Sequence, residues 1–342
     1  MTIAIDATYS VGGSLSGVGR YSREILFGLA QAHPEQRFRF AYRAHRLRQS
    51  LADSLPANAS RRLLHGAFPR VDLLHGLNQR LDAGRFRHAV ATVHDLFVLT
   101  GEYSTPEFRE RFAAQARQAA RRADLVIAVS AFTADQVHNL LGVERSRIRV
   151  IHHGVRGPAN PPPDSARRNF ILHVGAIQSR KNIVRLIRAF EATPPGWNLI
   201  LAGSAGYGAA EAMAAIEASP RREDIRVFGY VTDSKLAELY DEARVLAFPS
   251  LDEGFGIPVI EAMAHGLPVL TSNASALREV AGDAALLVDP ADQDAIASGL
   301  RELTASVSAR DDWRIRGLAH AALFEWKTAV DKTWAVYEEL LP

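Results

Sequence analysis

The 342-residue chain contains no cysteine, three methionines and four lysines, and it has no long hydrophobic run. The absence of cysteine excludes disulfides, thiol catalysis and cysteine-ligated zinc or iron–sulfur sites, and it fits a reducing compartment. No stretch approaches the roughly 18 apolar residues that a membrane-spanning helix requires. The N-terminal segment reaches Asp6 without a basic leader, so we expect no secretory signal and a cytoplasmic location.

The formal net charge of +2 hides an uneven distribution of charge along the chain. Up to Val155 there are 21 arginines, no lysine and 13 acidic residues, which gives +8, whereas the remainder has 19 basic and 25 acidic residues, which gives −6. A basic segment of this kind favours an anionic partner such as a membrane surface or a nucleic acid. The alternative is that each arginine only keeps the surface solvated.

Short apolar runs alternate with amphipathic segments of helical length, which is typical of parallel sheets covered by helices on both faces. Since the length exceeds that of a single hydrophobic core, we expect an α/β fold with two doubly wound, Rossmann-like domains. The predicted strands are Thr2–Asp6, Val71–His75, Ala89–Val93, Leu125–Val129 and Arg147–Ile151, then Phe170–Val174, Asn198–Ala202, Ile225–Phe228, Val245–Pro249 and Pro268–Thr271. The predicted helices of the first part are Val18–Ala32, Pro106–Arg122 and Ala131–Leu141.

A segment rich in proline and glycine, Gly154–Arg168, separates these two parts and predicts an irregular linker. We therefore expect an N-terminal domain over residues 1–157 and a second domain that begins at residue 158. In doubly wound sheets ligands bind at the carboxyl ends of the strands, so the loops after the strands are the candidate sites.

Two loops of the first part have features of a ligand site. Gly17 and Gly19 lie at the start of a predicted helix, where backbone amides and the positive end of the helix dipole favour an anion. A flexible turn between a strand and a helix would have the same sequence pattern. The segment lacks the last glycine of the dinucleotide-binding fingerprint, so it does not indicate a dehydrogenase. His94 directly follows an apolar strand and could make polar contacts or transfer a proton, but a lone histidine is more often structural.

The loop after the strand Phe170–Val174 contains Gly175 and then two adjacent cations, Arg180 and Lys181. Adjacent cations beside a cleft can neutralise a diphosphate. Cations at the start of a helix oppose the helix dipole, and this unfavourable position strengthens the functional interpretation over that of a solvated helix start.

The segment Phe248–Gly266 combines a strand end, a glycine-spaced loop and a helix that starts near Pro258 and ends at Gly266. Its loop amides suit an anion or sugar hydroxyls. Glu253 lies in the loop and Glu261 lies one turn into the helix, so the two carboxylates could bind two hydroxyl-bearing parts of one ligand. For Glu261 the alternative is an acidic residue placed to favour the helix dipole.

Taken together, these segments resemble the retaining glycosyltransferases of family 4, which have the GT-B fold and two glutamates separated by seven residues. The resemblance covers essentially the whole chain. It implies that residues 326–342 form a C-terminal helix that packs on the N-terminal domain. Residues 158–325 would then form the nucleotide-sugar domain. The resembling segments are Gly17 and Gly19, Val93-His94-Asp95, Gly175 with Arg180-Lys181-Asn182, Phe228-Gly229-Tyr230-Val231, Glu253-Gly254-Phe255-Gly256, Glu261, and Glu279-Val280 with Gly282-Asp283-Ala284-Ala285.

The resemblance also implies roles for individual residues. Arg180 and Lys181 would bind the donor diphosphate, Glu261 the ribose, and His94 the donor sugar near its reacting carbon. Glu253 would hold the donor sugar together with the amides that follow it. The expected catalytic residues are His94, Arg180, Lys181 and Glu253, and the expected donor-binding residues are Gly17, Gly19, Gly175, Phe228, Gly229, Val231, Gly254, Phe255, Gly256, Ile257 and Glu261.

We expect no metal or other cofactor, because Arg180 and Lys181 stand where a cation would act and because Asp292-Gln293-Asp294 opens a helix as a cap. The expected partners are a nucleotide-sugar donor, with GDP-mannose preferred over UDP-sugars, and a glycan or lipid-linked acceptor of bacterial surface polysaccharide synthesis. Contact with an anionic membrane is a further expectation.

Two other function classes remain as alternatives. A non-catalytic sugar-nucleotide-binding subunit of a glycan assembly complex would share the donor site, but the complete set of candidate catalytic residues disfavours it. A nucleic-acid-binding protein is disfavoured because no recognition motif or aromatic platform accompanies the arginines.

Overall fold

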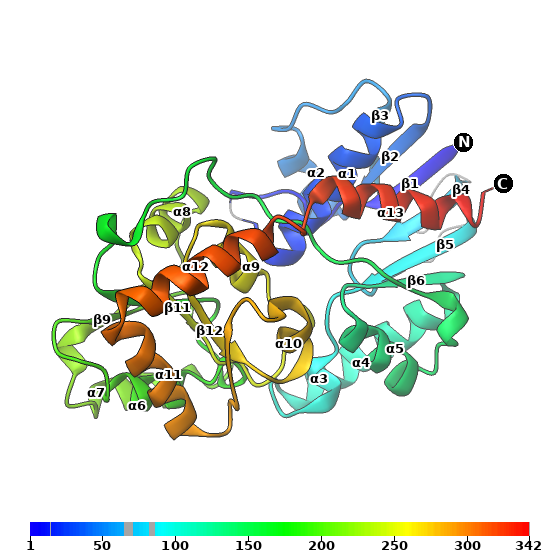
Figure 1. Cartoon of the computed structure of the whole chain (residues 1–342). Helices are drawn as coiled ribbons and strands as arrows, with labels where there is room; N and C mark the ends of the chain where they lie inside the picture. Colours follow the sequence, from blue (N-terminus) through cyan, green and yellow to red (C-terminus); the bar gives the residue numbers. More distant parts are fainter. Residues whose placement is uncertain (14, 65–70, 82–85, 342) are drawn as a thin grey trace. The chain divides into compact units, whose positions relative to one another are not determined.

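The computed structural model describes residues 1–13, 15–64, 71–81 and 86–341, and it divides into two compact units. Unit 1 comprises Met1–Thr100, Thr105–Gly154 and Glu325–Pro342, and unit 2 comprises Gly101–Ser104 and Val155–Phe324. Each unit contains one parallel sheet with helices on both faces, as the alternation of strands and helices in the sequence predicts (Figure 1).

Unit 1 contains a seven-stranded sheet with the order β3-β2-β1-β4-β5-β6-β7, in which all pairs are parallel. The strands are β1 (Thr2–Asp6), β2 (Arg37–Tyr42), β3 (Ala59–Leu63), β4 (Val71–Gly76), β5 (Phe86–Val93), β6 (Leu125–Ala128) and β7 (Ile148–Val150). The helices are α1 (Gly17–Ala32), α2 (Ala44–Ser50), α3 (Phe97–Thr100), α4 (Pro106–Arg122), α5 (Ala131–Leu141) and α13 (Trp326–Glu338).

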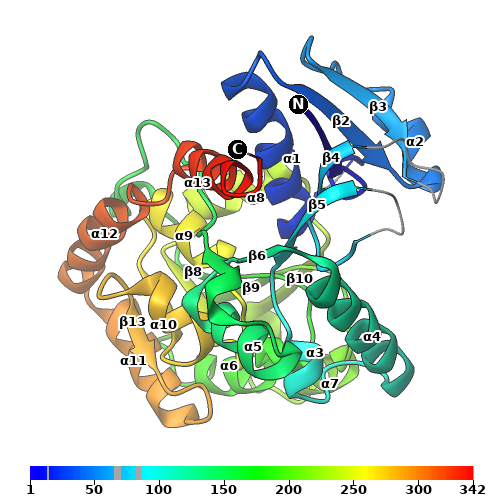
Figure 2. The same ribbon diagram turned by 90° about the vertical axis from the view of Figure 1, so that its right-hand side faces the viewer.

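One face of this sheet packs on α1 and α13, and the other packs on α4 and α5. The C-terminal helix α13 lies beside α1 although about 300 residues separate them in sequence, which confirms that the chain returns to the N-terminal unit (Figures 1 and 2). Ala329, Val330 and Tyr337 of α13 enter the same core as Ile25 and Leu26 of α1.

Unit 2 contains a six-stranded parallel sheet with the order β10-β9-β8-β11-β12-β13. The strands are β8 (Phe170–Val174), β9 (Asn198–Ala202), β10 (Ile225–Gly229), β11 (Val245–Phe248), β12 (Val269–Ser272) and β13 (Leu286–Val288). The helices are α6 (Ile183–Phe190), α7 (Ala209–Glu217), α8 (Asp233–Glu242), α9 (Ile257–Ala264), α10 (Ser275–Ala281), α11 (Gln293–Ala305) and α12 (Val307–Ala321). Since the strand order reverses between β8 and β11, the loops after these two strands meet where doubly wound sheets bind ligands.

Three strands, β2, β3 and β13, were missing from the sequence-based prediction. In β2, Arg37 and Arg39 alternate with the buried Phe38 and Phe40. This alternation of polar and apolar residues is typical of a strand, but the run of arginines made the segment look polar in the sequence. Its neighbour β3 contains Arg61 and Arg62 and lies at the sheet edge, where charged side chains are common.

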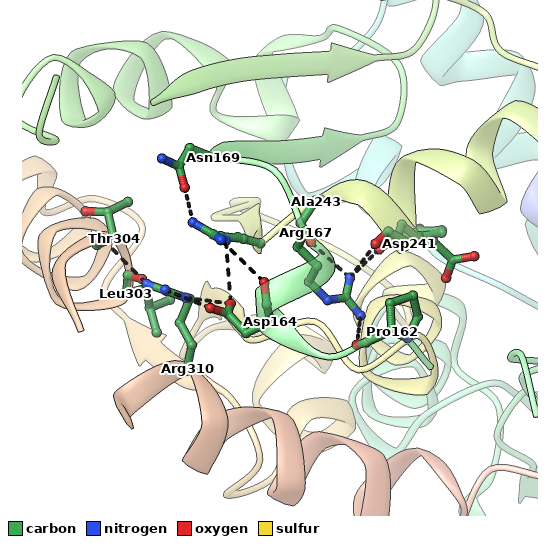
Figure 3. A network of polar contacts seen from close by, with 11 residues as sticks. Pro162, Asp164, Arg167, Asn169, Asp241, Ala243, Leu303, Thr304 and Arg310 are labelled. Atoms are coloured by element: carbon green, nitrogen blue, oxygen red, sulfur yellow. Dashed lines mark hydrogen bonds and ion pairs between the residues drawn. The ribbon is translucent and has the colours of Figure 1, made fainter. Parts of the chain in front are cut away.

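The linker between the units is irregular, as predicted, except for a short 3₁₀ turn at Asp164–Ala166. Asp164 accepts two hydrogen bonds from Arg310 of α12, from Nε at 2.8 Å and from Nη2 at 2.9 Å (Figure 3). Arg167 donates to the carbonyl groups of Tyr240 and Ala243 at the end of α8. The linker is therefore held against unit 2 by hydrogen bonds and ion pairs of buried charged side chains.

Replacing Asp164 by Asn should lower the free energy of unfolding by about 3 kcal/mol or more, because Arg310, 3% exposed, would keep a buried charge without its carboxylate. Asp331→Asn is the matched control: Asp331 pairs with Lys327 on the exposed surface of α13, and its loss should cost less than about 1 kcal/mol. Urea denaturation checks both values. An equal, small effect of the two substitutions would contradict this description of the linker.

Candidate functional site

The loop after β8 places two cations at the carboxyl end of the unit 2 sheet. Arg180 and Lys181 lie in a 3₁₀ turn, Ser179–Lys181, and Asn182 follows in a left-handed conformation before α6 begins. The Asn182 side chain donates to the carbonyl groups of Pro249 at 3.0 Å and Pro290 at 2.7 Å. The cations thus directly precede the first residue of α6 and lie at the positive end of the helix dipole.

Glu253, in the loop after β11, lies between these two cations. Its Oε2 is 2.7 Å from Nη1 of Arg180, and its Oε1 accepts a hydrogen bond of 2.5 Å from Nζ of Lys181. All three side chains are at most 10% exposed. The backbone of Glu253 is held at the start of α10, because its N–H donates to Oγ of Ser275 at 3.1 Å and its carbonyl accepts from Ala276.

Burial alone would raise the pKa of Glu253, but the charges of Arg180 and Lys181 outweigh this effect and lower the pKa to about 2. The carboxylate is therefore ionised at neutral pH, and the cluster has two positive charges and one negative charge. The excess of one positive charge, away from water, makes this point of the sheet attractive to an anion.

The rings of Phe248 and His173 pack beside Lys181. Nζ of Lys181 is 4.5 Å from the centre of the Phe248 ring, and that ring stacks on His173 at 5.5 Å. His173 hydrogen-bonds through Nδ1 to the carbonyl of Ala247, and burial lowers its pKa to about 4, so no further positive charge competes beside Lys181. Gly175 has a φ of +133°, and a Cβ there would lie 3.3 Å from Cε of Lys181.

Glu261 lies on α9, where its Oε2 accepts a hydrogen bond of 3.0 Å from the hydroxyl of the buried Tyr240. This hydrogen bond fixes the orientation of the Glu261 carboxylate. Gly256 precedes α9 with a φ of +99°, and a Cβ there would meet Cδ2 of Leu277 at 2.4 Å, so a side chain is excluded. α9 begins at Ile257, so Pro258 occupies its second position rather than the first.

The remaining predicted donor-binding residues of unit 2 lie at the end of β10 and in the loops after β10 and β11. Phe228 and Tyr230, on either side of Gly229 with its φ of +64°, are exposed, whereas Val231 packs partly against the core. Gly254 precedes Phe255, whose ring is buried against Phe324 with 6.0 Å between ring centres. The Phe255 side chain therefore supports the loop.

Unit 1 contains the other predicted residues. Gly17 and Gly19 open α1, and a Cβ on Gly19 would meet the carbonyl of Tyr9 at 2.8 Å, which explains that glycine by packing. His94 follows β5 and donates from Nε2 to the carbonyl of Leu77 at 2.8 Å. Burial lowers the pKa of His94 to about 4, so the ring is neutral and Nδ1 is its acceptor.

The structure thus brings Arg180, Lys181 and Glu253 into direct contact. The sequence-based prediction missed several supporting residues, namely His173, Tyr240 and Ser275. His173 and Tyr240 read as ordinary core positions of a strand and a helix. Ser275 has a φ of +53°, a conformation that residues other than glycine rarely adopt. Nothing in the sequence around a serine predicts it.

Comparison with known proteins agrees with this geometry. Residues 160–319 match the family described as "Glycosyl transferases group 1", and residues 19–156 match "Glycosyltransferase Family 4". The O-antigen chain mannosyltransferase B of Escherichia coli is 31% identical over an alignment of 379 positions, which covers 98% of this chain and 99% of the relative. The chain belongs to the family 4 glycosyltransferases. The O-antigen chain mannosyltransferase RfbU of Salmonella typhimurium is 29% identical over 64% of this chain and 61% of the relative.

Two solved structures share the architecture. Sucrose-phosphate synthase from Thermosynechococcus elongatus superposes with a TM-score of 0.81 at 21% identity and covers 100% of this chain and 99% of its own. HepE from Anabaena, in complex with UDP and glucose, superposes with a TM-score of 0.76 at 19% identity over 99% and 100% of the two chains. The two Rossmann-like units of this glycosyltransferase therefore form the predicted GT-B fold.

Two further observations concern the part of the chain that the structure describes. None of its helices is long and apolar enough to cross a membrane. Within the same residues, no group of three or more histidine, aspartate or glutamate side chains is arranged to hold a metal ion. Asp292 accepts hydrogen bonds from the N–H groups of Asp294 and Ala295, so the Asp292-Gln293-Asp294 segment caps α11 as predicted.

Proposed function

We propose that this glycosyltransferase transfers mannose from GDP-mannose, with retention of anomeric configuration, to a hydroxyl of a glycan or lipid-linked acceptor in bacterial surface polysaccharide synthesis. The observation that carries the proposal is the buried pair of cations, Arg180 and Lys181, which share the carboxylate of Glu253. The choice of mannose is supported by the Escherichia coli relative, a mannosyltransferase that aligns with nearly the whole chain.

The first step in the proposed mechanism is an exchange of anions at Arg180 and Lys181. The donor diphosphate takes over these two cations, which are preorganised at the carboxyl end of β8 and stabilise the charge that develops on the leaving group. Glu253, displaced from the cations, then accepts hydrogen bonds from hydroxyl groups of the donor sugar. The amides of Gly254, Gly256 and Ile257 hold the same sugar.

In the transfer step the bond between the anomeric carbon and the diphosphate oxygen breaks, and the acceptor oxygen bonds to that carbon on the same face. The departing diphosphate accepts the proton of the acceptor hydroxyl, so no protein nucleophile and no metal ion is needed. We further propose that Glu261 binds the ribose and that the backbone from Phe228 to Val231 contacts the base.

His94 contributes to this mechanism as a neutral group. Because burial keeps its pKa at about 4, the imidazole adds no positive charge near a sugar carbon that becomes positive in the transition state. Its Nε2 is occupied by the carbonyl of Leu77, so Nδ1 is the atom that accepts a hydrogen bond from a sugar hydroxyl.

Thermal unfolding in the presence of GDP-mannose, UDP-sugars and ADP-sugars tests the donor. A ligand at about 100 times its Kd stabilises a protein by roughly 2.7 kcal/mol, and we expect the largest shift with GDP-mannose. Proton NMR of the glycosylated product, or of mannose released in slow donor hydrolysis, should show the α-anomer first. Stabilisation by GDP-mannose with neither transfer nor hydrolysis would instead support a non-catalytic sugar-nucleotide-binding subunit.

Substitution of the two glutamates should separate their roles. Glu253→Gln removes the carboxylate that competes with the diphosphate, so free GDP should bind as tightly as to the wild type or more tightly, while transfer falls by about a hundredfold. Glu261→Gln loses a ribose contact and should weaken binding of free GDP. Isothermal calorimetry measures both affinities. Equal losses of GDP affinity in the two variants would contradict the exchange mechanism.

The arginines of unit 1 support a second part of the proposal, a peripheral contact with an anionic membrane on the cytoplasmic side. Some of them are engaged within the fold: Arg61 donates to the carbonyl of Ser50, Arg147 to that of Ala120, and Arg149 pairs with Glu339. Others are exposed on α4, which carries the half-exposed Phe108 beside Arg111. The exposed arginines of α4 are Arg111, Arg117 and Arg121.

Three arginines of β2 and β3 lie on the face of the sheet that α4 covers. Ala41 packs in the same core as residues of α4, and Arg37 and Arg39 share its side of β2 by the alternation of the strand. Arg62 is the partner of Ala41 in the register of β3. These three arginines line a hollow of about 490 Å³, so six arginines lie on one side of unit 1.

Co-sedimentation with vesicles tests this contact. With anionic vesicles at low salt we expect pelleting, and the triple change of Arg111, Arg117 and Arg121 to Gln should weaken the partition by about a hundredfold, since each arginine contributes about 1 kcal/mol. The matched control changes the exposed Arg226, Arg301 and Arg316 of unit 2 to Gln. Pelleting that is independent of lipid charge, or equal effects of both triple variants, would remove the membrane from the proposal.

A further inference from the structure

A chain of buried hydroxyl and imidazole groups crosses unit 1 and ends beside His94. The hydroxyl of Tyr337, on α13, is 2.6 Å from Nδ1 of His75, at the end of β4. Nε2 of His75 is 2.8 Å from Oγ1 of Thr92 on β5, and that hydroxyl is 2.9 Å from the hydroxyl of Tyr21 on α1. The chain therefore joins the C-terminal helix to three elements of the N-terminal half.

All four residues of this chain are at most 1% exposed. Burial lowers the pKa of His75 to about 3, so its ring is neutral, and burial raises the pKa values of both tyrosines. A neutral imidazole has one donor and one acceptor nitrogen, so Tyr337 and Thr92 must take opposite roles towards His75. Because water cannot substitute for a lost partner, the direction of every bond depends on the others.

The chain contacts His94 through Tyr21, the residue at its end. The Tyr21 ring meets the His94 ring edge to face, with 4.7 Å between ring centres, and it meets His153 in the same way at 4.9 Å. His153 also stacks on His94 at 5.4 Å. Thr92 precedes His94 by two residues, so both side chains lie on the same side of the extended backbone.

We propose that Tyr337 and His75 are positioning residues for His94. The phenol of the C-terminal helix fixes the tautomer of His75, which fixes the Thr92 hydroxyl and the Tyr21 ring that packs against the His94 imidazole. The C-terminal helix thereby helps to position the His94 side chain in addition to covering the core. The effect on turnover rests on the proposed role of His94 in sugar transfer.

The substitution Tyr337→Phe tests this proposal because it keeps the ring and removes the hydroxyl. The matched control is Thr333→Val on the same helix, which removes a buried hydroxyl that donates to the carbonyl of Ala329 within the helix at 2.7 Å. With Tyr337→Phe we expect kcat to fall between tenfold and a hundredfold, because a displacement of a catalytic group by about 1 Å can slow a reaction by up to about a hundredfold. The KM for the donor should not change. Thr333→Val should keep the wild-type kcat.

A second measurement does not depend on turnover. In ¹⁵N NMR spectra of the histidine rings, the wild-type protein should show one tautomer of His75 and an Nε2-protonated His94. Tyr337→Phe should mix the tautomers of His75 and shift the ring signals of His94, whereas Thr333→Val should leave both unchanged. Ring signals of His75 and His94 that are the same in Tyr337→Phe and the wild type would overturn the positioning role, whatever the fate of the proposed sugar transfer. Altered ring signals without any sugar transfer would support the role and reject only the proposed function.

Discussion

The ion pairs of Glu253 with Arg180 and Lys181 are the interaction on which the rest of the site depends. Two buried cations would be costly without a counter-charge, and the carboxylate supplies it at distances of 2.7 and 2.5 Å. The same arrangement leaves one positive charge in excess. The site is therefore stable as a folded structure and still favours a ligand with more negative charge than one carboxylate.

The backbone of unit 2 is built so that these charges meet. The strand order reverses between β8 and β11, and each of the two following loops contributes one side of the ion pairs. Asn182 joins the loop after β8 to the loop after β11 by its bond to Pro249 and to the loop after β13 by its bond to Pro290, and Ser275 holds the backbone of Glu253. Neither loop could shift by a residue without separating the charges.

The sequence predicted most of the fold because its strands are apolar runs with helices between them. It predicted Arg180, Lys181 and Glu253 as candidates because adjacent cations before a helix and a carboxylate in a glycine loop are unusual, and because these segments resemble those of the family. It did not predict that these residues pair with one another, since pairing depends on which strands become neighbours in the sheet. Strands β2 and β3 were missed because arginines on one face concealed the alternation. The bond between His75 and Tyr337 joins residues 262 positions apart, and no local pattern reports such a contact.

The proposed exchange of anions at Lys181 can be tested directly, because the chain has only four lysines. In ¹⁵N-lysine-labelled protein at low temperature, the buried ammonium of Lys181 should give a protected signal, distinct from those of the three other lysines. Addition of GDP should move this signal, and Glu253→Gln should move it without GDP. A Lys181 signal that responds to Glu253→Gln but not to saturating GDP would contradict the account, because the diphosphate would then bind elsewhere.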